Sequence, residues 1–229
     1  MQPRKSQLEE TVTRIVNLAT CTIFALAIPS LVNAQQADMS FFVTSANPGK
    51  GANLGGLEGA DAHCAALAKA AGAAKTTWRA YLSTTAPQGG AGINARDRIG
   101  NGPWQNAKDV VVANNIDELH SGKSNVNKDT ALTEKGEVVK GRGDDVNMHD
   151  VLTGSDPQGM YSTAGGDTNC KNWTSDGEGS AIVGHHDRIG LKDTRHMKSW
   201  NSSHGTRGCD MESLKGTGGA GLFYCFAAE

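Results

Sequence analysis

The sequence predicts an exported α+β domain with long loops. One segment has the apolar spacing of an amphipathic helix, several short segments are typical of β-strands, and 29 of the 229 residues are glycine while only 5% are aromatic. This composition favours many turns and a modest core over long helices. Several cysteines spread along the chain add the expectation that disulfides stabilise the domain.

The first 34 residues are predicted to be a signal peptide. Basic residues precede an apolar run over residues 15–32, which ends in the small-residue stretch Val32-Asn33-Ala34. Pro29 interrupts the run, which fits a cleaved leader better than a retained membrane anchor. A lipoprotein leader ending at Cys21 is the alternative, but most of the apolar segment follows that cysteine. We therefore expect cleavage before Gln35 and a secreted or periplasmic protein without a membrane anchor.

Residues 35–229 have a length typical of one domain. After cleavage, 19 basic residues stand against 22 acidic residues, and the basic residues are scattered along the chain. A scattered, slightly negative charge favours neither nucleic acid nor an acidic polysaccharide as the partner.

Four cysteines remain after cleavage: Cys64, Cys170, Cys209 and Cys225. An even number in an exported protein predicts two disulfides, and four cysteines permit three pairings. A zinc site is the competing interpretation, but the chain has no CxxC pair and the cysteine spacing differs from that of zinc-binding motifs.

The first elements are predicted from residues 41–83. The β-prone run FFVTS, residues 41–45, is an opening strand ended by an Asn-Pro-Gly turn. Residues 57–72 repeat apolar side chains at helical spacing, with Cys64 on the apolar face and Gly72 as the stop. Residues 77–83, TWRAYLS, alternate like a strand with one buried face, which would carry Trp78, Ala80 and Leu82.

The middle of the chain is predicted to hold shorter elements. Residues 109–113, DVVVA, resemble a short buried strand, and residues 115–122 a helical turn with Asn115 as cap and Gly122 as stop. Residues 131–139 carry a hairpin signal around Glu134-Lys135-Gly136. The remainder, to about Thr168, is predicted to be loop with an acidic cluster.

The last predicted strand, GLFYC, covers residues 221–225. A run of large apolar residues after a glycine-rich stretch suits a strand in the middle of a sheet. Cys225 on such a strand can reach back to the Cys64 helix, and Cys170 with Cys209 would then close a smaller inner loop.

This nested order resembles that of C-type lectin-like domains, and the chain is most similar to the endostatin domain of collagens. The matching segments run in family order over residues 41–226: GLEGADAHCAALAKAAG, TWRAYLS, RIGNGPWQNAKD, ELHSG, GEVVKG, VLTGSDPQG, NCKNWTS and FYCF. The resemblance implies an antiparallel sheet, two helices, long loops and two nested bridges. It also implies binding of sugar, protein or matrix rather than catalysis.

The functional motifs of these families are incomplete in this chain. Sugar-binding members hold calcium through a proline-containing tripeptide, which is missing here, and through Trp-Asn-Asp, where this chain has Trp200-Asn201 followed by Ser202. Losing that carboxylate weakens a calcium site. The alternative is that Trp200 packs in the core and Asn201 caps a turn. Endostatin-type zinc and heparin binding lack support, because the predicted start QQADMSFF has no histidine and no arginine patch is present.

Two other segments carry possible metal ligands. Residues 141–150, GRGDDVNMHD, place the acids Asp144, Asp145 and Asp150 near Asn147 and His149. Such a loop could fold round a divalent cation, although a solvated polar loop is the commoner outcome. The second segment, GHHDRIG at residues 184–190, sets His185 and His186 beside Asp187. Adjacent side chains usually diverge, which weakens that hypothesis.

The sequence therefore predicts a lectin-like binding module that recognises a carbohydrate or a surface macromolecule. The predicted contact regions are residues 141–160 and 184–207, and the candidate ligand-binding residues are Asp187, Trp200, Asn201 and His204. A non-sugar protein-interaction module is the alternative, and a metal-dependent hydrolase built on His185, His186, Asp187 or the acidic loop is the third hypothesis. No enzyme is predicted, because the chain lacks a Gly-x-Ser-x-Gly elbow and a phosphate loop. No cofactor is assigned.

Overall fold

The computed structural model describes residues 36–86, 91–163 and 165–228. The predicted signal peptide, residues 1–34, lies outside this part of the chain. Within the described ranges, no helix has the length and apolar character needed to cross a membrane.

The described residues form a mixed α/β structure. In chain order the elements are β1 (Phe41–Val43), α2 (Gly56–Ala70), β2 (Trp78–Ala80), the 3-10 turn η1 (Ala95–Arg98), β3 (Trp104–Gln105), β4 (Val111–Ala113), α3 (Ile116–Leu119), β5 (Asp150–Leu152), α4 (Cys170–Trp173), β6 (Ile182–His185), β7 (His204–Gly205), α5 (Met211–Thr217) and β8 (Gly219–Ala227). The predicted loop before Thr168 thus contains strand β5, too short and too polar at its start to be read as a strand from the sequence.

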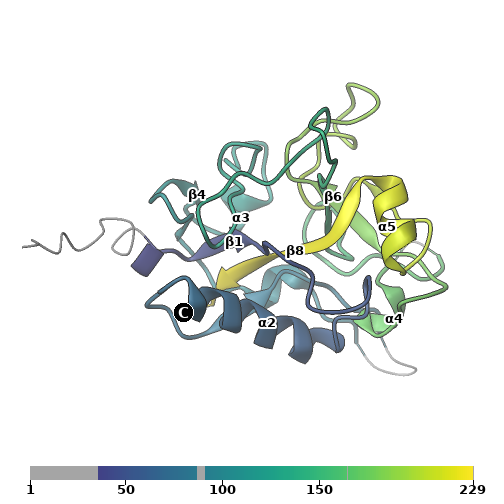
Figure 1. Cartoon of the computed structure of the whole chain (residues 1–229), viewed down its shortest axis with the longest axis horizontal. Helices are drawn as coiled ribbons and strands as arrows, with labels where there is room; N and C mark the ends of the chain where they lie inside the picture. Colours follow the sequence, from purple (N-terminus) through teal and green to yellow (C-terminus); the bar gives the residue numbers. More distant parts are fainter. Residues whose placement is uncertain (1–35, 87–90, 164, 229) are drawn as a thin grey trace, which may run out of the picture.

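Strand β8 is the centre of the main sheet, as predicted for the terminal run. The strand order is β1-β8-β5-β6-β7, and β2 also pairs with β8. All pairs are antiparallel except β5 with β8, which is parallel. Figure 1 shows the long strand β8 crossing the molecule beside β1. The expectation of a purely antiparallel sheet is therefore wrong at this one pair.

The first helix is fastened to the central strand by a disulfide. Helix α2 buries Ala60, Cys64 and Ala68, which recur every four residues on one face. The Cys64–Cys225 bridge spans 161 residues of sequence and joins Cα atoms 5.6 Å apart. The second bridge joins Cys170 to Cys209. Both predicted disulfides and the nested pairing are thus confirmed.

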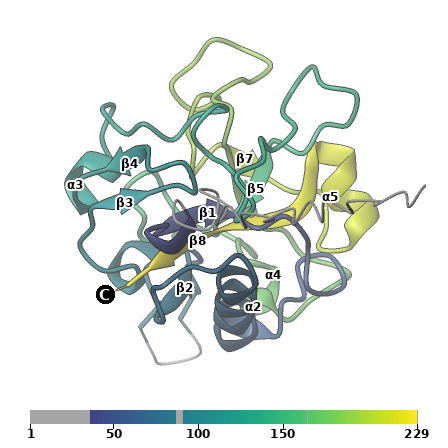
Figure 2. The ribbon, with the colours of Figure 1, turned by 60° about the vertical axis from the view of Figure 1, so that its left-hand side comes forward.

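Two hydrophobic clusters cover opposite faces of the sheet. One packs under α2, and the other lies toward β3, β4 and α3 (Figure 2). Tyr81, expected on the exposed face of the predicted strand at residues 77–83, follows the end of β2 and is fully buried, with its ring centroid 4.9 Å from that of Trp200. Strand β4 pairs only with β3 and leaves Val111 39% exposed, so the predicted buried strand is an edge ribbon instead.

The short central elements were predicted at the right positions, but their lengths differ from the prediction. Asn115 caps α3, because its side chain accepts a hydrogen bond from the Glu118 N–H, but the helix ends at Leu119 and not at Gly122. The predicted hairpin at residues 131–139 is a tight turn with a single bridge between Leu132 and Val138. Instead of two helices, the described ranges hold α2, α5 and two one-turn helices.

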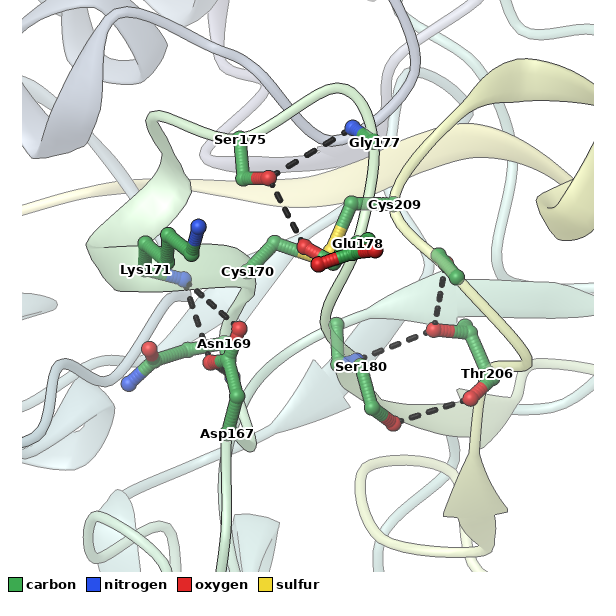
Figure 3. Close-up of a disulfide and its surroundings, with 12 residues drawn as sticks. Asp167, Asn169, Cys170, Lys171, Ser175, Gly177, Glu178, Ser180, Thr206 and Cys209 are labelled. Carbon is green, nitrogen blue, oxygen red and sulfur yellow. Dashed lines mark hydrogen bonds between the residues drawn. A yellow bond between two sulfur atoms is a disulfide. The ribbon is translucent and has the colours of Figure 1, made fainter.

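Helix α4 is a left-handed turn. Its residues from Cys170 to Trp173 have φ between 50 and 66°, a region that costs L-residues free energy. The disulfide to Cys209 fixes one end, as Figure 3 shows, and the Asp167 carboxylate accepts a hydrogen bond from the Lys171 N–H at 3.0 Å. At the other end, the Trp173 indole N–H donates to the Ser83 carbonyl oxygen at 2.9 Å. These contacts hold a strained turn in place.

Replacing Lys171 by glycine tests this strain. The Lys171 side chain is exposed, so Lys171→Gly is expected to raise the free energy of unfolding by about 0.5–1 kcal/mol, because glycine adopts positive φ without penalty. Ala66→Gly on the exposed side of α2 is the control, and it should lower stability by about 1 kcal/mol. Urea unfolding measures both; equal losses in the two variants would contradict the strained geometry.

Candidate metal centre

Strand register brings three candidate residues together. Asp150 on β5 lies directly opposite His185 on β6, and Val183, two residues before His185, lies opposite His204 on β7. Residues two apart on a strand share a face, which makes His204 a diagonal neighbour of His185. The sheet therefore collects side chains from segments far apart in sequence.

His149 joins this group although it precedes Asp150 directly. Neighbouring residues on a regular strand point to opposite faces. Here His149 lies just before β5, and the pairing of β5 with β8 is irregular between Asp150 and Val151. Such an irregularity changes the direction of side chains. The His149 and Asp150 side chains consequently meet, with Nε2 and Oδ1 3.2 Å apart.

Three imidazole nitrogens converge on one carboxylate oxygen. Asp150 Oδ1 lies 3.2 Å from His185 Nε2 and 3.5 Å from His204 Nε2, and these two nitrogens are 3.0 Å apart. The His149 and His185 rings stack with centroids 4.1 Å apart. We call His149, Asp150, His185 and His204 the histidine cluster.

The outer ring nitrogens of the cluster all face acceptors. His149 Nδ1 is 3.3 Å from an Asp187 carboxylate oxygen, His185 Nδ1 is 2.7 Å from the Met197 carbonyl oxygen, and His204 Nδ1 is 3.2 Å from the Gly205 carbonyl oxygen. Carbonyl oxygens and ionised carboxylates accept hydrogen bonds and do not donate them, so these contacts favour the tautomer with the proton on Nδ1 in each ring. In the neutral rings the three Nε2 lone pairs then point into the cluster, as they do in metal-binding histidines.

The Asp150 carboxylate is buried without a sufficient partner. Its side chain is 1% exposed, and neither oxygen accepts a hydrogen bond of good geometry from the described residues. Burial alone would raise the pKa of Asp150, but its contacts with the His185 and His204 rings hold that pKa below the usual range. Conversely, Asp150 raises the pKa of His204. An ionised carboxylate buried at this position needs positive charge beside it, from a protonated ring such as His204 or from a bound cation.

The geometry of the cluster fits a tetrahedral metal ion. Zinc binds histidine nitrogen and carboxylate oxygen at about 2.0–2.2 Å, which places neighbouring ligand atoms of a tetrahedron about 3.3 Å apart. The separations of 3.2–3.5 Å between Asp150 Oδ1 and the three Nε2 atoms, and of 3.0 Å between the Nε2 atoms of His185 and His204, match that edge length. His149, Asp150 and His185 each offer a ligand atom within 4.8 Å of one another. Calcium prefers six to eight oxygen ligands, so a set of three imidazoles favours zinc or another divalent transition metal over calcium.

Asp187 supports the cluster from outside. Its carboxylate, buried and facing His149, also accepts hydrogen bonds from the Arg142 N–H at 2.7 Å and the Ile189 N–H at 3.0 Å. Burial would raise the pKa of Asp187, but these hydrogen bonds lower it to about 2. An ionised Asp187 fixes the ring of His149, the usual role of a carboxylate behind a metal-binding histidine.

Glycine makes room for the His149 ring. Gly218 adopts φ 109°, and a Cβ atom there would stand 3.1 Å from His149 Nε2 and 2.7 Å from the Asn147 side-chain nitrogen. A side chain at this position would therefore crowd the Nε2 atom of His149.

The other predicted site residues lie elsewhere. Trp200 is 3% exposed and its indole N–H donates to the Leu119 carbonyl oxygen, while Asn201 is 1% exposed and donates to the Tyr81 hydroxyl oxygen. Asp144 and Asp145 pair with Lys128 and Lys140 at the surface. Of the four candidate ligand-binding residues, Asp187 and His204 are thus at the histidine cluster. Trp200 packs in the hydrophobic cluster toward β3, β4 and α3, and Asn201 is hydrogen-bonded to Tyr81 of that cluster.

His186 does not share the site of its neighbour. Its Nε2 lies 3.3 Å from the Lys140 carbonyl oxygen, and burial lowers the pKa of His186 to about 4. Only His185 of this pair faces the cluster, as alternation along β6 requires.

A comparison with models of protein families and with curated proteins finds no match to this chain.

The Tyr81–His120 contact beside Trp200 gives a pH-dependent prediction. The Tyr81 hydroxyl lies 2.7 Å from His120 Nε2, and His120 Nδ1 lies 2.8 Å from the Ile116 carbonyl oxygen, an arrangement that suits neutral His120. Burial lowers the pKa of His120. Below the unfolded pKa of about 6.5, the unfolded chain therefore binds a proton that the folded protein does not, and stability falls.

We expect the free energy of unfolding, measured in chelator, to fall more steeply between pH 7 and pH 5 for the native protein than for His120→Gln. The slope difference should approach about 1.4 kcal/mol per pH unit at most. Parallel pH profiles for the two proteins would show that His120 titrates equally in both states.

Proposed function

We propose that this protein binds a divalent transition metal ion of the zinc class and recognises its ligand through that ion. The proposed metal ligands are His149, Asp150, His185 and His204. The observation that carries the proposal is the convergence of three Nε2 atoms, each on a ring whose Nδ1 faces an acceptor, on a buried carboxylate oxygen. Imidazole and carboxylate are common zinc ligands.

An open cleft gives a ligand access to the proposed ion. The cleft has a volume of about 580 Å³, and His149, His185 and His204 lie in its lining. Asp150 lies beneath these rings, at 2% exposure. The three imidazoles face the cleft, and a metal held by the four proposed ligands could take an oxygen atom of a ligand from the cleft by expanding from four to five ligands.

The lectin-like interpretation remains part of the proposal. A mixed fold with two nested disulfides supports a C-type lectin-like or endostatin-like domain, and such bridges are typical of oxidising, extracytoplasmic compartments. Both predicted contact regions, residues 141–160 and 184–207, contribute to the lining of the cleft, including the three histidines. A carbohydrate or a surface macromolecule would then bind at the metal and not at Trp200.

Metal-assisted hydrolysis is the second candidate, favoured by the same open cleft. A bound divalent ion lowers the pKa of a coordinated water and so supplies a nucleophile. Ester turnover that requires zinc and disappears in His204→Ala would favour hydrolysis over binding alone.

A pair of histidine variants tests the metal site. His204 has a side chain 27% exposed, so His204→Ala should fold, and we expect it to weaken zinc binding about 100-fold or more. The control His196→Ala removes an exposed histidine outside the cluster and should bind one zinc per chain like the native protein. Competition titration with a zinc indicator measures both affinities.

Asp187→Asn tests the supporting carboxylate. Because Asp187 contacts His149 and not the proposed ion, zinc affinity should fall about 10- to 100-fold while the stoichiometry stays at one. Native protein that binds no zinc, or binds it equally well without His204, would contradict the proposed function.

A further inference from the structure

The cleft above the histidine cluster is lined by positive charge. Arg142 from the loop before β5, Arg207 after β7 and Lys215 on α5 line it together with the three imidazoles, and no carboxylate is in the lining. The whole chain carries a formal net charge of −2, so the charge in this cleft is opposite in sign to the net charge of the chain. Opposite charge in a ligand would be attracted to such a cleft.

These three cations are available to a ligand. All three side chains are exposed, and none forms an ion pair or a side-chain hydrogen bond within the described ranges. By contrast, Lys128 and Lys140 nearby are paired with Asp144 and Asp145. The Arg207 guanidinium lies against α5, since a Cβ atom on Gly216 would be 3.8 Å from its Nη1. Arg207 and Lys215 thus share one wall, and Arg142 comes from another segment.

The charges indicate the class of ligand. A divalent ion in the histidine cluster would be balanced by the carboxylates of Asp150 and Asp187, which lie beneath the cleft. The positive charges of Arg142, Arg207 and Lys215 would then remain unbalanced, and a ligand in the cleft would meet a net positive charge. A dianion matches this charge better than a single carboxylate, and guanidinium groups suit the paired oxygens of phosphate.

Apolar side chains stand beside the cations. Leu191, which is 77% exposed, and Met197 also line the cleft. An organic group next to the anion could cover Leu191, which inorganic phosphate cannot do. The lining therefore favours a phosphate that carries an apolar substituent.

We propose that the cleft binds a phosphate group, with one oxygen on the metal ion and others on Arg142, Arg207 and Lys215. The inference rests on the proposed metal site and adds the chemical class of its ligand. The phosphate can be free or part of a monoester, and the contact with Leu191 should make the monoester bind more tightly.

Calorimetry with the zinc-loaded full chain, freed of unbound zinc and kept at constant ionic strength, tests this proposal. Inorganic phosphate, phenyl phosphate and acetate are the three probes. We expect saturable binding of both phosphates, tighter for phenyl phosphate, and at least tenfold weaker binding of acetate. Arg207→Gln and Lys215→Gln should each weaken phosphate binding at least tenfold while retaining one zinc per chain.

Lys108→Gln is the matched control, because Lys108 is an exposed lysine in the turn between β3 and β4. Lys108 is outside the lining of the cleft, and Figure 2 shows β3 and β4 on the other side of the molecule from α5. The control should therefore bind phosphate like the native protein. No phosphate binding by protein with one bound zinc would overturn this inference and leave the metal site standing. Equal binding of acetate, or equal loss in Lys108→Gln, would also overturn it. Failure to load zinc would instead reject the proposed function.

Discussion

Strand β8 fixes both the fold and the place where the histidines meet. Its Cys225 is bridged to Cys64 across 161 residues of sequence, which fastens the last strand to the first long helix. In the chain-entropy model a loop of this length contributes about 5 kcal/mol. On the side away from β1, β8 pairs with β5, and β5 in turn pairs with β6. The bridge that holds β8 therefore also holds the strands that carry Asp150 and His185.

The histidine cluster contains a buried carboxylate, Asp150, whose negative charge a metal ion would balance. Asp150 Oδ1 lies 3.2–3.5 Å from the Nε2 atoms of His149, His185 and His204, and the Nε2 atoms of His185 and His204 are 3.0 Å apart. Neighbouring ligands of a tetrahedral ion have separations of this size. A proton shared with His204 offsets only part of the cost of burying Asp150. A divalent ion beside Asp150 Oδ1 would place positive charge where His149, Asp150 and His185 each offer a ligand atom. Such binding contributes directly to the stability of a small domain, of order 10 kcal/mol in structural zinc sites.

Local patterns predicted the elements, but not the site. The spacing around Cys64 and the apolar run ending at Cys225 depend on residues close in sequence, and both were confirmed. The cluster depends on the register between β5 and β6, which are 30 residues apart, and on an irregularity that turns His149 toward Asp150. His149 and His185 both lie in segments that the sequence indicates as possible sources of metal ligands. No short-range rule could select Asp150 rather than Asp144 as a metal ligand, because the two residues differ in burial and the local sequence does not distinguish them.

Diffraction data from crystals of the zinc-loaded protein, collected at the zinc absorption edge, test the metal centre most directly. We expect one anomalous peak within the histidine cluster, about 2.0–2.1 Å from the Nε2 atoms of His149, His185 and His204. A peak at another position, or an empty cluster in protein that carries one zinc per chain, would contradict the assignment of these residues as metal ligands.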